Sequence, residues 1–104
     1  MRKAITYVHQ LKAGLLIEND NHTFSFIYDE NYNAQPVSLT MPINQKVYTF
    51  NDFPPFFEGL LPEGIMLEGL LKINKLDSTD FFSQLIAVGF DMIGAVTVKL
   101  LVDE

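Results

Sequence analysis

The residues of this chain best suited to acid–base chemistry at neutral pH are its two histidines, His9 and His22. His9 stands beside Gln10 in a segment with strand character, and His22 follows a polar turn. Neither histidine has a nucleophile or a carboxylate at a spacing typical of a catalytic pair. The chain has no cysteine, which excludes a thiolate zinc site, a cysteine nucleophile and a disulfide framework.

Metal and phosphate chemistry are also poorly supported. The acidic stretches 18–21 and 29–31 contain oxygen ligands, but they lack the spacing and the terminal bidentate glutamate of a calcium loop. Gly59, Gly64 and Gly69 recur every five residues, which fits neither a dinucleotide fingerprint nor a P-loop. We therefore expect no metal, no cofactor and no enzymatic activity, and a binding module becomes the default interpretation.

Charge and hydropathy exclude two further classes of partner. The net charge is −6, and the seven basic residues are scattered, with no basic run longer than Arg2-Lys3. Direct binding of nucleic acid is therefore not expected. A signal peptide would continue after this basic start with an uninterrupted apolar segment, but here His9, Gln10 and Lys12 interrupt it. No apolar stretch of the chain approaches the length of a membrane span. These features predict a cytoplasmic protein.

The first half of the chain predicts strands. Apolar and polar residues alternate in 4–8 and again in 22–28, where Phe24, Phe26 and Tyr28 share one face. We expect a turn at 11–14, a second strand from 15 onward, a turn at 18–21 and a polar loop at 29–35. A short strand is expected at 37–41, before Pro42.

The second half changes to a helical period. The prolines at 54 and 55 favour a helical turn over 56–61, which Pro62 ends, and a second helix is expected over 63–76. Asp77 or Ser78 is the predicted N-cap of a third helix that runs to Gly89, and 93–102 returns to strand character. The order of elements predicts a single α+β domain over residues 1–104, with an antiparallel sheet, short helices and a closing C-terminal strand.

The segment 56–71, FFEGLLPEGIMLEGLL, concentrates large apolar residues around one proline. At about 100° per residue, a helix over 63–76 places its predicted core stripe at Met66, Leu67, Leu70, Leu71 and Ile73. Ile65 falls on the opposite side. One interpretation is that the rest of the fold covers it, and the other is a protruding apolar tip that enters a groove of a partner.

Two sets of residues follow. The predicted core includes Phe24, Phe26, Leu70, Leu71, Phe82 and Leu85. The candidate partner-binding residues are Phe56, Phe57, Leu61, Pro62, Glu63, Gly64, Ile65 and Met66.

Four segments, 24–28, 37–42, 55–64 and 89–95, together resemble the N-terminal subdomain of the HipA kinase toxins. Each segment is modest alone, but the Phe-Phe-Glu-Gly-Leu-Leu-Pro-Glu-Gly block followed by Gly-Phe-Asp-Met-Ile-Gly-Ala is specific in combination. A HipA kinase continues with the parts that bind ATP and carry the catalytic aspartate, whereas this chain stops at Glu104. The resemblance is therefore to the split arrangement, in which this subdomain is a separate small protein.

The resemblance implies a HipS-type antitoxin of a HipBST system. Such a protein binds and inhibits a HipT-like serine/threonine kinase toxin, and a HipB-like protein supplies the DNA-binding helix-turn-helix. The alternative is an N-terminal subdomain, separately encoded or expressed, that completes and supports an active HipA-type kinase. A generic structural adaptor is a third possibility.

Overall fold

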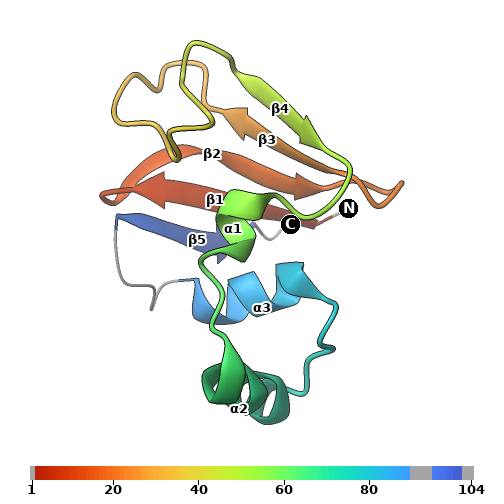
Figure 1. Ribbon diagram of the computed structural model, residues 1–104. Helices are drawn as coiled ribbons and strands as arrows, with labels where there is room; N and C mark the ends of the chain where they lie inside the picture. The colour runs from red at the N-terminus through yellow and green to blue at the C-terminus, as the bar shows by residue number, and fades with distance from the viewer. Residues whose placement is uncertain (1, 90–94, 102–104) are drawn as a thin grey trace.

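The sheet is the largest element of the domain. The computed structural model describes residues 2–89 and 95–101, and within them five strands form one antiparallel sheet in the order β4-β3-β2-β1-β5 (Figure 1). The α+β architecture and the closing strand are confirmed, although residues 93, 94 and 102 of the predicted last strand lie outside the described residues. The strands are β1 (Arg2–Val8), β2 (Leu11–Glu18), β3 (Phe24–Tyr28), β4 (Val47–Phe50) and β5 (Val96–Leu100).

The first hairpin turns earlier than the sequence predicts. His9 and Gln10 connect β1 to β2 with φ angles of 49° and 70°, which suit a tight two-residue hairpin loop. The predicted turn at 11–14 is wrong, because these residues begin β2. Gly14 instead allows β2 and β3 to approach closely, because a Cβ atom at this position would lie 2.2 Å from the carbonyl oxygen of Ile27 on β3.

The predicted strand at 37–41 is also wrong. This segment contains only an isolated bridge between Ser38 and Met41, and β3 pairs instead with β4 on the side away from β2. The Tyr28 hydroxyl holds the loop in place, because it accepts a hydrogen bond from the Val37 amide at 2.9 Å and donates one to the Met41 carbonyl. Val37 and Met41 are thereby buried and belong to the hydrophobic core.

The core lies on one face of the sheet. Phe26, Phe82 and Leu85 are buried, as predicted, whereas Phe24 is half-buried at the edge of the core. Leu70 and Leu71 are only half-buried, so their assignment to the core is wrong. The opposite face, here called the outer sheet face, carries the half-buried Ile5, Leu15 and Ile27 and the exposed Val47.

The helices are α1 (Pro55–Glu58), α2 (Gly64–Asn74) and α3 (Phe81–Val88). Figure 1 shows α1 in front of the sheet, α3 beneath it, and α2 farther from the sheet than α3. The N-cap of α3 is Asp80, whose carboxylate accepts the Ser83 amide at 3.1 Å, so the predicted cap at Asp77 or Ser78 is wrong. Asp77 instead closes a turn with the Thr79 amide before the helix begins.

An arginine from β1 fixes α3 against the sheet. The Arg2 guanidinium donates to Glu18 at 2.7 Å and to Asp80 at 3.0 Å, and it lies 4.8 Å from the centre of the Phe82 ring. Burial by itself raises the pKa of Asp80, but hydrogen bonds from Ser83 and Arg2 outweigh it and hold the pKa below its usual value. Asp80 therefore stabilises the folded state in its charged form.

We predict that Asp80→Ala lowers the free energy of unfolding by about 1–2 kcal/mol at pH 7, because α3 loses its cap. A carboxyl with a lowered folded-state pKa contributes stability above its unfolded pKa and loses it as the pH falls through the folded one. The deficit of the variant should therefore shrink at pH 3. Ser78→Ala is the control, and urea unfolding should show a change within about 0.5 kcal/mol. A larger loss for Ser78→Ala than for Asp80→Ala would contradict the assigned cap.

Candidate partner-binding surface

The candidate segment begins with an anchor. Phe57 of α1 is fully buried, and its ring lies 5.8 Å from that of Phe26 on the sheet. Its side chain is committed to the domain's own core, so we remove Phe57 from the candidate contact residues. Phe56 is half-buried and packs against the edge of the same core.

Between α1 and α2 the chain leaves the core in steps. Leu60 and Leu61 are partly buried against the core, and Pro62 is half-buried. Glu63 is exposed and extended, and Gly64 opens α2 with a φ of +60°, in the left-handed region that disfavours other residues. Leu61 and Pro62 therefore support the turn, whereas the segment 63–66 stands in solvent.

The helix that follows exposes large apolar side chains next to two charged ones, Glu68 and Lys72. The side chains of Ile65, Met66 and Ile73 are 85%, 74% and 82% exposed, and no residue of α2 is buried. Helical spacing places Gly69 among them, and a Cβ atom on Gly69 would meet nothing within 4 Å. We call Ile65, Met66, Gly69 and Ile73 the outer α2 face.

The opposite side of α2 is turned toward the domain. Leu67, Leu70 and Leu71 are half-buried, and α2 contacts α3. The returning loop is held by Gln84, whose side-chain amide donates to the carbonyls of Asp77 and Ser78 at 3.0 and 3.2 Å. The helix is thus fixed along one strip only.

The predicted exposure of Ile65 is confirmed, whereas the predicted burial of Met66 and Ile73 is wrong. Ile65 points away from the core, as predicted, but Met66 and Ile73 do not belong to the core stripe. A single neighbouring helix covers a strip of roughly 100°, which is narrower than the predicted stripe. Ile73 was missed as a candidate, although a spacing of seven residues places it only about 20° from Met66 around the helix.

Other kinds of site find little support in the part of the chain that the structure describes. Within residues 2–89 and 95–101, no three histidine, aspartate or glutamate residues are grouped so that they could hold a metal ion. No helix of this part is long and apolar enough to cross a membrane. The outer α2 face is therefore the feature that most needs an explanation.

The fold and the surface together define the class of protein, which is a small α+β domain with a solvent-exposed apolar face on one helix. Residues 4–99 match the model of the HipA N-terminal domain family, and the chain belongs to this family. It is 32% identical, over 84 residues, to an uncharacterized protein of Haemophilus influenzae, covering 81% of this chain and 79% of that protein. Family membership gives the chain a HipA-related toxin–antitoxin context.

A solved structure agrees with this assignment. The N-terminal domain of HipA toxin superposes with a TM-score of 0.79 at 28% sequence identity. The match covers all of this chain and 96% of that one. The resemblance to the HipA N-terminal subdomain is thus confirmed in both sequence and fold, and the fold similarity extends over α2 and its surroundings.

Two glycines provide a matched test of the geometry. Gly69→Ala should raise the free energy of unfolding by up to about 1 kcal/mol, because a mid-helix alanine costs less conformational entropy and meets open space. Gly14→Ala should lower it by about 1–3 kcal/mol, because its Cβ atom would overlap the Ile27 carbonyl. Urea unfolding of both variants measures the two changes. A destabilised Gly69→Ala variant would show that another part of the domain covers this side of α2.

Proposed function

We propose that this chain is a non-catalytic, HipS-like antitoxin that binds and inhibits a HipT-like serine/threonine kinase toxin. In this proposal it works in the cytoplasm within a three-component HipBST-type complex. A HipB-like subunit holds the DNA, and this chain contacts neither DNA nor nucleotide itself. Its net charge of −6 supports the last point, because phosphate backbones repel an acidic surface.

The observation that carries the proposal is the outer α2 face. Each fully buried isoleucine or methionine side chain stabilises by about 1.5–3 kcal/mol relative to the exposed one. Ile65, Met66 and Ile73 remain in water in the isolated domain, so this stabilisation is still available to a complex. A helix whose apolar side fits a groove of the partner is a common mode of recognition.

Family membership supports a kinase as the partner. The related solved structure is the N-terminal domain of a toxin, that is, one domain of a larger protein. In our proposal, a domain of this family expressed as a separate chain packs on a kinase core through the outer α2 face. Association through this surface would place the exposed segment 63–66 against the kinase.

A steric mechanism follows from the shape of this segment. Gly64 and the half-buried Pro62 direct α2 away from the sheet, so the tip extends beyond the domain's own core. In the proposed complex, Ile65 and Met66 pack near the active-site cleft of the kinase. They block either the substrate or the closure of the cleft, and they do so without any reacting group.

A second function uses the same surface with the opposite result. The chain matches nearly the whole N-terminal domain of HipA toxin, which favours a subdomain that completes an active HipA-type kinase. A phosphorylation assay with a HipT-like kinase separates the two proposals. An antitoxin lowers autophosphorylation when added, whereas a completing subdomain raises it.

We predict that Ile65→Asp weakens kinase binding by roughly 1–3 kcal/mol, because it places a charge in an apolar contact. Folding should survive, since the side chain is 85% exposed in the isolated domain. The matched control is Leu39→Asp, which changes a 95% exposed leucine outside α2 and should leave inhibition intact. The measurements are thermal unfolding, calorimetric affinity for the kinase and suppression of autophosphorylation.

Phe57→Ala completes the set. It should lower the free energy of unfolding by about 3–5 kcal/mol, since it empties a buried position of the core. If Ile65→Asp unfolds the domain, Ile65 belongs to the core after all. If it is stable and fully inhibitory, the inhibitory contact lies elsewhere, with the half-buried Phe56 as the next residue to test.

A further inference from the structure

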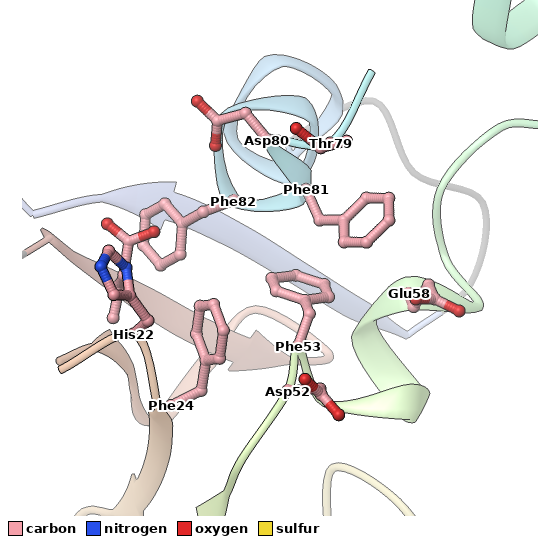
Figure 2. A pocket seen from close by; sticks show the side chains of 10 residues that line it. His22, Phe24, Asp52, Phe53, Glu58, Thr79, Asp80, Phe81 and Phe82 are labelled. Atoms are coloured by element: carbon pink, nitrogen blue, oxygen red, sulfur yellow. The ribbon is translucent and has the colours of Figure 1, made fainter. Parts of the chain in front are cut away.

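A second surface feature lies on other elements of the fold. A cavity of about 470 Å³ opens between the end of β2, the start of β3, α1 and the first turn of α3. Figure 2 shows the phenylalanine rings of its lining gathered together, with carboxylates around them. Its lining consists of Glu18, His22, Phe24, Asp52, Phe53, Glu58, Thr79, Asp80, Phe81 and Phe82.

The aromatic wall is ordered by ring contacts. Phe53 is buried, and Phe24 packs edge-on against it with ring centres 5.3 Å apart. Phe81 meets Phe53 from the other side at 5.7 Å. Phe24 and Phe81 are only half-buried, so part of each ring remains open to a ligand.

The carboxylates differ in how they are used. Glu18 and Asp80 are paired with Arg2. Asp52 and Glu58 are exposed, and neither side-chain carboxylate has a hydrogen bond or an ion pair within the described part of the chain. The described residues include no group of three histidine, aspartate or glutamate side chains that could hold a metal ion.

One guanidinium is already bound beside this cavity. Arg2 lies over the Phe82 ring at 4.8 Å while it donates to two carboxylates of the lining. A planar guanidinium combines stacking on an aromatic face with charged hydrogen bonds to carboxylates, which an ammonium group does less well. Phe24, Phe81, Asp52 and Glu58 line the same cavity and offer the same two kinds of group, aromatic rings and carboxylates.

We infer that the open side of this cavity binds an arginine side chain of a partner protein. The chain's net charge of −6 favours a basic partner segment, and the free carboxylates of Asp52 and Glu58 complement one positive charge at this place. The inference rests on the proposed function only for the identity of that partner, which would be the kinase. Together with the outer α2 face, the cavity would form a second point of contact that fixes the orientation of the complex.

The first experiment needs no kinase. The folded chain is titrated by NMR with the capped tripeptide acetyl-Gly-Arg-Gly-amide, with the lysine and glutamine peptides as comparisons. The arginine peptide should cause saturable shifts at Phe24, Phe53 and Phe81, and the glutamine peptide should leave these signals in place. The double variant Asp52→Asn/Glu58→Gln should weaken arginine-peptide binding by about fivefold.

The matched control removes two charges elsewhere. Asp20→Asn/Glu30→Gln changes two exposed carboxylates outside the cavity and outside α2, and it should leave the affinity unchanged. Shifts spread over the whole acidic surface, or equal losses in both double variants, would overturn the inference. Equal binding of the lysine peptide would overturn the assignment to arginine.

The second experiment measures the affinity of the kinase for the same two double variants. The cavity variant should bind about fivefold more weakly than the control variant. If the arginine peptide binds the cavity but the kinase does not bind the chain at all, the proposed function fails and the cavity remains. If the kinase binds both variants equally and the peptide causes no local shifts, the cavity inference fails and the proposed function stands.

Discussion

The packing of Phe57 on Phe26 determines how the helical half of the chain meets the sheet. Phe57 is fully buried in a helix of four residues, so α1 is held on the sheet by this one side chain more than by its own hydrogen bonds. Phe82 and Leu85 hold α3 on the same face. With that face occupied, the intervening residues 59–80 have no sheet surface left, and α2 lies beyond α3 (Figure 1).

This arrangement explains how α2 can be apolar on two sides. Leu67, Leu70 and Leu71 reach back toward the domain and keep the helix in place, whereas Ile65, Met66 and Ile73 face solvent. The large apolar side chains of a helix normally face the core, whereas on α2 three of them are exposed beside Glu68 and Lys72. The exposed apolar side lowers solubility without adding stability to this chain, so a docking function gives these residues a physical reason to be there.

Much of the fold follows from local pattern, and the failures have local causes. The alternation of Phe24, Phe26 and Tyr28 and the separation of the helices at Pro62 were readable from the sequence. The prediction of a turn at Gly14 is wrong because the sequence does not show the tertiary contact that requires a glycine there, the close approach of β3. The exposure of Met66 and Ile73 depends on how many neighbours cover α2, which periodicity does not encode. The cavity between β3, α1 and α3 could not be predicted from the sequence either, because the residues that line it are far apart in the chain.

Hydrogen exchange of the chain with and without the kinase locates the kinase contact, because it reports on the backbone amides of all elements at once. We expect the amides of α2 to exchange fast in the isolated domain, where no residue of this helix is buried, and to become protected in the complex. Protection confined to the strands, with α2 unchanged, would contradict this expectation. Such a result would place the contact on a sheet surface, either the outer sheet face or an edge strand, and leave the outer α2 face without a partner.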